Sequence, residues 1–318
     1  MKRALAALCI IASSASPALS QSCNFTMPNI NFGTIDLTTG VNYDTNVTFQ
    51  AICTGIAGRT VRICPNFNAG SGGVDGTGAN RYMLNGINQL RYNLYRNAAF
   101  TQVWGSRTWG LPPVPPTINI VLNAAGSGTS NTVVRGRVFS GQGALPVGPY
   151  SSSFAGAQTR VNYAYSTSGT CPAITTANLN PTQTPFSVSA IAGGVCTVTA
   201  TNLDFGAQTL LNNTVDASNS VSVRCPSAVP YTIGLNGGNT GAADPTAREM
   251  DNGTDIVTYG IYRDAARSLG WGETIGVNTV AGTGTGAVQN YTAYGRIPAQ
   301  VTPPADTYSD TIVVTVTY

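Results

Sequence analysis

Histidine is absent from the 318 residues, and lysine occurs only once, as Lys2. These absences exclude triads with a histidine base and histidine metal sites, and they exclude a lysine Schiff base or P-loop lysine in the body of the chain. Charged residues are only 9% of the chain. The carboxylates Glu249, Asp251, Asp255 and Asp264 show neither a paired-carboxylate signature nor the ligand spacing of a known calcium loop. We therefore predict a protein that is not an enzyme and has no cofactor and no metal site.

Helical periodicity is also missing. No stretch of about 10 to 12 residues keeps apolar side chains at helical spacing. Glycine is abundant, with 36 residues, and short alternating segments are separated by Gly-rich turns. This composition is typical of an all-β protein with negligible helix.

Long apolar runs are confined to the N-terminus. Met1-Lys2-Arg3 precedes an apolar segment that contains Cys9, and Ala18-Leu19-Ser20 resembles a cleavage site. Residues 1–20 are therefore predicted to be a secretory signal peptide. Because no later run reaches the roughly 18 residues of a membrane helix, we expect the rest to be soluble and exported.

Six cysteines follow the predicted signal peptide: Cys23, Cys53, Cys64, Cys171, Cys196 and Cys225. None belongs to a Cys-x-x-Cys pair, which argues against redox and zinc sites. An even number in an exported protein indicates three disulfides formed in an oxidising compartment.

An internal repeat organises these cysteines. Residues 23–33 and 196–206 both begin with cysteine and end in Phe-Gly, and the next cysteine follows the first after 30 and 29 residues. By analogy between the copies we predict the pairs Cys23–Cys53 and Cys196–Cys225. Cys64 and Cys171 both belong to the first copy, so Cys64–Cys171 is the simplest third pairing.

Further landmarks recur in both copies. They are Tyr-x-x-Tyr-Arg at 92–96 and 259–263, Trp-Gly at 104 and 271, Gly-Arg at 136 and 295, and a final strand at 160–165 and 312–318. We interpret the matched tyrosines and tryptophans as core packing. The repeat predicts two tandem immunoglobulin-like β-sandwich domains, an N-terminal one over residues 21–165 and a C-terminal one over 196–318.

The cysteine-to-glycine opening, the Tyr-x-x-Tyr-Arg segment and the alternating C-terminal strand resemble the spore coat protein U domain. That family supplies the subunits of archaic chaperone-usher pili, and a tandem pair resembles a two-domain tip adhesin. The resemblance implies that the C-terminal domain lacks its final strand and accepts one from the next pilus subunit. It also implies a periplasmic pilus chaperone and an outer-membrane usher as partners. The expected location is the cell surface, at the pilus tip, after passage through the periplasm.

The segment before Cys196 alternates, with Phe186, Val188, Ala190 and Ala192 on one face. Under the resemblance this is a donor-like strand within residues 166–195 that completes the N-terminal domain in cis. The alternative is that residues 166–195 form a flexible linker. Cleavage before Gln21 leaves no such strand ahead of the first domain. The chain would then be an acceptor without a free donor, confined to the end of a polymer.

Two loops of the first copy are more apolar than their counterparts. Residues 106–116 form a proline-rich insertion, and residues 139–149 replace the more polar residues 298–307. Exposed apolar patches mark interaction sites. We therefore predict an adhesive tip formed by Trp109, Leu111, Pro112, Pro113, Val114, Leu145 and Val147. The alternative is that these loops fold over the sandwich ends and cover the core.

Charge divides unevenly, with nine arginines and three aspartates in residues 21–185 but five arginines and ten acidic residues in 186–318. The basic half suits anionic surfaces, whereas its dispersed arginines argue against nucleic acid. The leading hypothesis is a tip adhesin that mediates attachment to abiotic or host surfaces and biofilm formation. A second hypothesis is an outer coat component of the spore-coat type, without a polymer. The alternating strands and the aromatic terminus Tyr318 suggest a third, an outer-membrane β-barrel, but three disulfides and the repeat argue against it.

Overall fold

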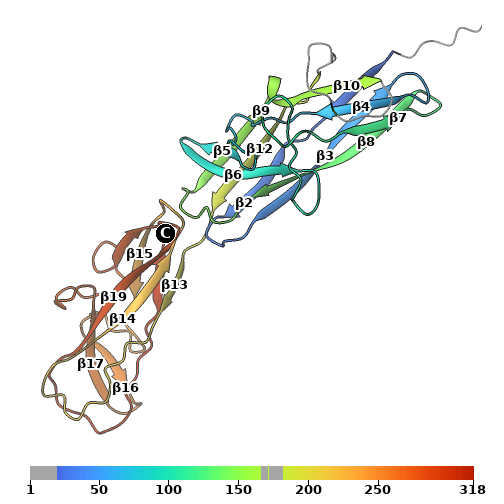
Figure 1. The fold of residues 1–318 in the computed structure, drawn as a ribbon. Helices are drawn as coiled ribbons and strands as arrows, with labels where there is room; N and C mark the ends of the chain where they lie inside the picture. The colour runs from blue at the N-terminus through green and yellow to red at the C-terminus, as the bar shows by residue number, and fades with distance from the viewer. Residues whose placement is uncertain (1–19, 166–170, 172–181) are drawn as a thin grey trace, which may run out of the picture.

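Strands dominate the computed structural model, which describes residues 20–165, 171 and 182–318. The predicted signal peptide, apart from Ser20, lies outside these residues. Within the described ranges, the one helical element is a short 3-10 helix, η1 (Gly156–Thr159). The strands form two sandwiches that lie end to end (Figure 1). The prediction of an all-β chain with two tandem sandwiches is confirmed.

The N-terminal sandwich packs an eight-stranded sheet against a four-stranded sheet, and side chains from both sheets form one core. The eight-stranded sheet has the order β1 (Ser22–Thr26), β3 (Tyr43–Thr54), β8 (Ser127–Val138), β6 (Asn88–Tyr95), β5 (Arg81–Asn85), β9 (Gly148–Phe154), β12 (Phe186–Gly193), β2 (Ile30–Asp36). The four-stranded sheet has the order β11 (Thr182–Gln183), β10 (Arg160–Tyr165), β4 (Thr60–Pro65), β7 (Ile118–Val121).

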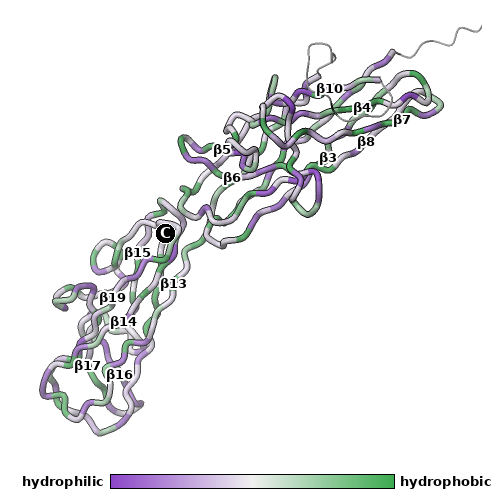
Figure 2. The backbone as a smooth tube through the Cα atoms, viewed as in Figure 1, coloured by the Kyte–Doolittle hydropathy of each residue, from purple (hydrophilic) through white to green (hydrophobic). Residues whose placement is uncertain are grey.

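The C-terminal sandwich is smaller and has a separate core. Its larger sheet has the order β13 (Thr197–Ala200), β14 (Val215–Arg224), β19 (Val288–Ile297), β17 (Ile256–Tyr262), β16 (Arg248–Asp251). Its smaller sheet has the order β18 (Val280–Thr283), β15 (Pro230–Leu235), β20 (Val314–Thr317). Figure 2 shows short hydrophobic segments interspersed with hydrophilic ones along both sandwiches. This is the pattern of strands that bury one face.

The Phe-Gly element that opens each copy has the same structure in both sandwiches. Gly33 and Gly206 adopt positive φ angles of 69° and 67°. Their backbone N–H groups donate to the side-chain oxygens of Asn31 (2.8 Å) and Asp204 (2.7 Å). Positive φ costs glycine little, and an Asn or Asp side chain caps such a turn. The repeat is therefore a local turn that the sequence specifies twice.

The glycine of each Gly-Arg landmark makes room for the neighbouring phenylalanine. A Cβ atom on Gly136 would lie 2.8 Å from Cζ of Phe32, and one on Gly295 would lie 2.8 Å from Cζ of Phe205. No side chain fits between the strand and the ring at that distance. The Phe-Gly element and the Gly-Arg landmark, although far apart in the sequence, therefore pack against each other in both sandwiches.

Each sandwich also contains a buried arginine. Arg81 is fully buried, and its guanidinium donates to the backbone carbonyls of Phe67 (2.6 Å), Asn68 (2.7 Å) and Trp104 (2.7 Å). Burial lowers the pKa of Arg81 to about 10. Arg248 makes the matching bonds to the carbonyls of Leu235, Asn236 and Trp271. These cations satisfy backbone carbonyls that would otherwise be buried without a partner.

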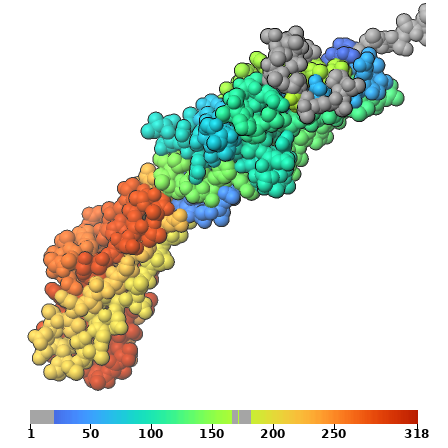
Figure 3. All heavy atoms as spheres, viewed as in Figure 1, coloured from blue at the N-terminus to red at the C-terminus, as the bar shows by residue number. Residues whose placement is uncertain are grey.

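The two sandwiches meet at a narrow junction (Figure 3). A single β-bridge joins Pro146 of the N-terminal sandwich to Ser227 of the C-terminal one. Nearby, a Cβ atom on Gly286 would lie only 1.8 Å from the carbonyl oxygen of Gly143. The backbones are therefore in direct contact at this point.

The two sandwiches have the same orientation along the molecule, so equivalent connections lie at the same end of each sandwich. The junction end of the C-terminal sandwich carries the β14–β15 and β18–β19 connections, residues 225–229 and 284–287. Their counterparts in the N-terminal sandwich are the β3–β4 and β7–β8 connections, residues 55–59 and 122–126. These two connections lie at the end farthest from the C-terminal sandwich (Figure 1). The arrangement is head to tail.

Candidate strand-binding groove

Strand β12 completes the N-terminal sandwich from inside the same chain. It runs antiparallel to β9, from Phe186 opposite Phe154 to Ala192 opposite Gly148, and parallel to β2 on its other side. The four side chains expected to face inward, Phe186, Val188, Ala190 and Ala192, are all buried. Phe186 stacks on Phe154 with ring centroids 4.4 Å apart. The segment is thus a central strand, flanked by hydrogen-bonded neighbours on both sides.

The C-terminal sandwich has a groove where a strand equivalent to β12 would lie. Its volume is about 680 Å³. Two matched contacts set the correspondence: Tyr150 Oη donates to the carbonyl of Pro146 (2.9 Å), and Tyr308 Oη donates to that of Pro304 (2.8 Å). The chain around Tyr308, which lines the groove, therefore corresponds to β9.

Both walls of the groove are irregular. One wall, residues 307–310, corresponds to β9, and the opposite wall, around residues 201–206, corresponds to β2. Neither segment forms a continuous strand. The lining is mainly apolar and includes Leu203, Phe205, Val221, Leu235, Ile312 and Val314. Unpaired backbone walls around an apolar floor are what an added strand would complete. Within the described residues, no segment of the C-terminal sandwich takes the place of β12, and the segments that correspond to β2 and β9 are not paired as strands.

A hydrogen-bonded carboxylate stands on one wall of the groove. Asp310 Oδ2 accepts from Tyr259 Oη (2.6 Å), and its Oδ1 accepts from the backbone N–H groups of Asn239 and Thr311 (2.7 Å each). Burial, with the nearby Asp310 carboxylate, raises the pKa of Tyr259, so this phenol remains a donor at neutral pH. The groove therefore combines an apolar floor with a fixed carboxylate on this wall, Asp310, while a second carboxylate, Asp204, lines the opposite wall.

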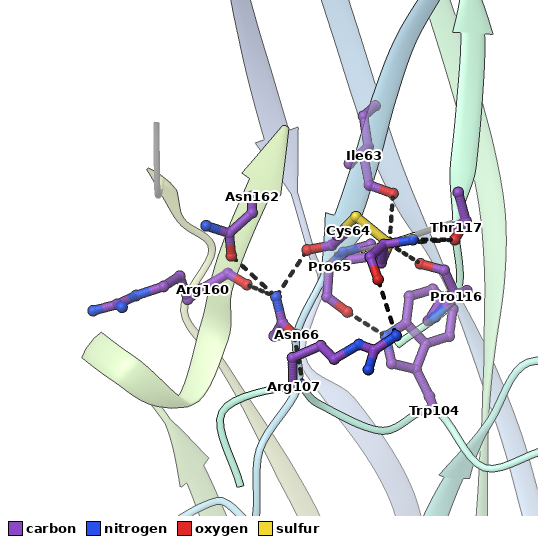
Figure 4. The surroundings of a disulfide bond; sticks show 11 residues. Ile63, Cys64, Pro65, Asn66, Trp104, Arg107, Pro116, Thr117, Arg160 and Asn162 are labelled. Carbon is purple, nitrogen blue, oxygen red and sulfur yellow. Dashed lines mark hydrogen bonds between the residues drawn. A yellow bond between two sulfur atoms is a disulfide. The ribbon is translucent and has the colours of Figure 1, made fainter. Parts of the chain in front are cut away.

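The three disulfides join the cysteine pairs that were expected: Cys23–Cys53, Cys64–Cys171 and Cys196–Cys225. Figure 4 shows the surroundings of the second of these. The backbone N–H of Cys171 donates to Thr117 Oγ1 (3.1 Å), and Arg107 Nη2 donates to the Cys171 carbonyl (2.9 Å). Cys171 is therefore fastened to β4 by its disulfide and to Thr117 and Arg107 by hydrogen bonds.

The first predicted adhesive loop, residues 106–116, folds back on the sandwich. The Trp109 ring is half-buried with the Arg81 guanidinium 4.7 Å from its centroid, and Trp109 Nε1 donates to the Pro113 carbonyl (3.2 Å). Leu111 and Pro113 are also half-buried, whereas Pro112 and Val114 are exposed. The Trp109 ring therefore covers the buried Arg81, while Pro112 and Val114 stay at the surface, and the adhesive role of this loop stays a prediction.

The second predicted loop, residues 139–149, does not lie at the tip. Leu145 packs against the core, Val147 is exposed, and Gly143 and Pro146 contact the C-terminal sandwich. The physical reason is strand direction. Because β12 runs antiparallel to β9, the loop that enters β9 lies at the end where β12 leaves toward the C-terminal sandwich. The expectation that both loops share one distal tip is wrong.

Exposed apolar side chains are also not confined to the N-terminal sandwich. In the C-terminal sandwich, Ile275 is 59% and Val277 is 66% exposed, compared with 36% for Val114. At the distal end of the N-terminal sandwich, Ile56 is 55% and Val121 is 67% exposed. Ile56 lies in the β3–β4 connection and Val121 is the last residue of β7. The β3–β4 and β7–β8 connections are joined by backbone hydrogen bonds, Gly58 N–H to the Leu122 carbonyl and Leu122 N–H to the Arg59 carbonyl (2.9 Å each).

The described residues contain no group of three or more cysteines and carboxylates placed to hold a metal ion. They also contain no helix of the length and apolarity needed to cross a membrane. The acidic residues named above as weak catalytic or calcium candidates form turns and strand ends instead. Asp264, for example, accepts hydrogen bonds from Ser268 and Leu269.

Comparison with known proteins places this pair of sandwiches in a family. The sequence matches the Spore Coat Protein U domain over residues 10–156 and again over residues 182–315. The chain belongs to the spore coat protein U domain family. Protein U of Myxococcus xanthus is 32% identical over 162 residues, which cover 46% of this chain and 86% of that protein.

This spore coat protein U domain chain is also similar to solved structures, and the first one described here shares its fold. One chain of the CsuC–CsuE chaperone–tip adhesion subunit pre-assembly complex, from archaic chaperone-usher Csu pili of Acinetobacter baumannii, superposes with a TM-score of 0.54 at 14% identity, over 93% of this chain and all of that one. The CupB6 tip adhesin from Pseudomonas aeruginosa gives 0.42 at 13% identity, over 93% of this chain and 94% of its own.

Sequence reasoning missed the polar residues that shape this family member. Arg81 and Arg248 each stand 23 residues before the matched tryptophan whose carbonyl they bind. That shared spacing was a signal, but arginine is seldom buried. No comparable signal marked Asp310, because the residue at the matching position of the N-terminal copy is Ser152.

Proposed function

We propose that this chain is the tip subunit of an archaic chaperone-usher pilus and that it mediates attachment and biofilm formation. The observation that carries the proposal is the asymmetry between the sandwiches. The donor-like strand β12 is already used in the N-terminal sandwich, while the groove of the C-terminal sandwich is open. A chain that has bound its donor-like strand in cis can still accept a strand at its open groove, and this is the arrangement that we propose for the terminal subunit of a polymer.

Strand direction supports a linear arrangement. A donor strand that copied β12 would run parallel to the wall at residues 201–206 and leave the groove at the end opposite the N-terminal sandwich. A pilus donor strand precedes its own domain, so the next subunit would follow beyond that end. The N-terminal sandwich would then stand outermost.

The proposed partners follow from the same groove. A sandwich with an open apolar groove exposes surface that favours aggregation, so a periplasmic chaperone would cover it before an outer-membrane usher exchanges the chaperone for the next subunit. Localisation would be the cell surface at the pilus tip, and the role would be structural and adhesive rather than enzymatic.

We propose the distal end of the N-terminal sandwich as the principal attachment surface. In the C-terminal sandwich the matching end is occupied by the neighbouring sandwich, whereas in the N-terminal one no other sandwich of the described chain covers it, and it carries Ile56 and Val121. Of the loop residues expected from the sequence, Pro112 and Val114 remain candidates for a secondary contact. Each buried aliphatic side chain contributes roughly 1.5 to 3 kcal/mol, so single contacts are weak. Many pili acting together would make attachment firm.

Electron microscopy of native fibres tests the tip assignment. An epitope tag inserted after Ile87, which is 95% exposed in the β5–β6 turn, leaves both sandwich cores untouched. We expect one label at one end of each fibre. Label along the shaft would contradict the tip assignment, and a surface layer without fibres would favour the coat-component alternative.

A further inference from the structure

The matched contacts between the sandwiches define the position of every groove residue relative to β12. Besides the two tyrosine bonds, an antiparallel pair joins Leu84 to Ser151 in the N-terminal sandwich, and a bridge joins Asp251 to Ser309 in the C-terminal one. In this register Asp310 takes the place of Ser152. The same wall therefore bears a carboxylate where the completed sandwich bears a hydroxyl.

In the completed sandwich, the residue beside this position is known. Val188 of β12 is directly opposite Ser152 of β9, and both side chains are fully buried. Directly opposed residues in an antiparallel pair project from the same face of the sheet with their Cβ atoms about 5 Å apart. A donor strand in the groove would accordingly place its corresponding residue next to the Asp310 side chain and cover it.

The Asp310 carboxylate has one acceptor position to offer that residue. A carboxylate accepts about four hydrogen bonds. Asp310 receives two at Oδ1, from Asn239 and Thr311, and one at Oδ2, from Tyr259. Covering the remaining Oδ2 position with an apolar side chain would remove water without replacing its hydrogen bond. A hydroxyl or amide N–H at this point would replace it.

We propose that the groove of the C-terminal sandwich selects a donor strand that carries threonine, serine or asparagine beside Asp310, between apolar residues that fill the floor. The inference rests on the proposed strand-acceptor function and names the partner's chemistry. It also excludes a second copy of this chain as the preferred donor, since its own strand presents Val188 at that position. The partner is a different subunit.

Peptide competition on the full chain tests the selection. A fluorescein-labelled peptide with the sequence of residues 185–193 is bound to the full chain, and two unlabelled peptides displace it: the same sequence, and its Val188→Thr variant. Valine and threonine have nearly the same shape, so the comparison isolates the hydroxyl. We expect the threonine peptide to compete at least fivefold better, and this preference to disappear in the Asp310→Ser chain.

A conservative variant and a control variant complete the test. Asp310→Asn preserves the shape of the wall if Asp310→Ser fails to fold, and it should reduce the preference because the acceptor loses its charge. Asp306→Ser, a carboxylate on the same segment outside the groove lining, should leave the preference unchanged. Equal competition by both peptides, or a preference that survives in Asp310→Ser and Asp310→Asn, would overturn the selection and leave the acceptor function standing. Failure of both the labelled peptide and a labelled Val188→Thr peptide to bind the full chain would contradict the acceptor function itself.

Discussion

Single buried polar residues carry much of the stability of each sandwich. Arg81 satisfies three backbone carbonyls and the side chain of Asn93 from inside the core. Its charge is buried without a carboxylate partner, so these dipoles and the Trp109 ring beside the guanidinium offset its lost hydration. The same arrangement recurs at Arg248. A cation used in this way is a structural residue, even though its type usually signals a surface or an anion site.

Replacing Arg81 with methionine should destabilise the N-terminal sandwich by at least about 3 kcal/mol, because several buried acceptors lose their donor at once. Urea unfolding followed by tryptophan fluorescence measures the change. The matched control is Arg137→Met, which removes a partly exposed ion pair with Asp44 (2.7 Å) and a contact with the Phe100 ring and should cost at most about 2 kcal/mol. Equal losses in the two variants would show that Arg81 is an ordinary surface-type cation.

The sequence could reveal the repeat because its landmarks have local causes. Gly33 and Gly206 mark capped turns, and Gly136 and Gly295 mark close approaches to a ring. The side of Asp310 that faces the groove could not be predicted, because it depends on a strand register that only the assembled sandwich sets. The disulfide pairing could be predicted from the sequence. Two of the pairs span nearly the same interval in the two copies, and the third joins the two cysteines that remain in the first copy.

At the scale of elements, β12 decides which sandwich is complete. It is the seventh strand along the eight-stranded sheet and binds neighbours on both sides. Its direction also decides where the loops lie, which is why the position of residues 139–149 could not be predicted from composition. The sequence predicted correctly that this loop is apolar, but the loop lies against the C-terminal sandwich instead of at the distal tip.

Substitution on the buried face of β12 should unfold the N-terminal sandwich, whereas substitution on its exposed face should not. Val188→Asp places a charge among fully buried side chains and should cost about 4 kcal/mol or more. Ile191→Asp, three residues along the same strand at a position that is 52% exposed, should change stability by less than about 1 kcal/mol. Thermal unfolding of both variants checks this. If the two lose the same stability, β12 is a surface linker.

At the scale of the whole molecule, the junction fixes how one sandwich is presented relative to the other. Gly286 has a φ of 76° and touches Gly143 directly. Gly276 has a nearly equal φ of 78°, but a Cβ atom on Gly276 would have no neighbour within 4 Å. The two glycines thus share a backbone conformation and differ only in what lies beside them.

Gly286→Ala should change the angle or separation of the sandwiches, because its methyl group would overlap the Gly143 carbonyl. Small-angle X-ray scattering of the full chain should show an altered maximum dimension. Gly276→Ala carries the same backbone strain, about 1 kcal/mol, and should leave the scattering profile unchanged. An unchanged profile in both variants would mean that the junction is not rigid.

Attachment should depend more on the distal end of the N-terminal sandwich, which carries Ile56 and Val121, than on its flank, the loop of residues 106–116. Replacing Ile56 and Val121 together by serine should abolish most binding of piliated cells to a hydrophobic surface, since it removes the apolar area there. Val114→Ser with Leu111→Ser should have a smaller effect. Pilus number, counted by electron microscopy, should stay equal. If the distal pair binds normally and the flank pair does not, the attachment surface lies on residues 106–116.

The direction of β12 also has a mechanical consequence. The strand runs along the long axis of the N-terminal sandwich and passes directly into the C-terminal one (Figure 1). Tension between an attached surface and the rest of the molecule therefore pulls β12 along its own length. Its hydrogen bonds to β9 and β2 are loaded together in shear instead of being opened one at a time. The strand that closes the core is thus also the connection between the sandwiches, and under the proposed tip function its resistance to sliding would set the force that the N-terminal sandwich withstands.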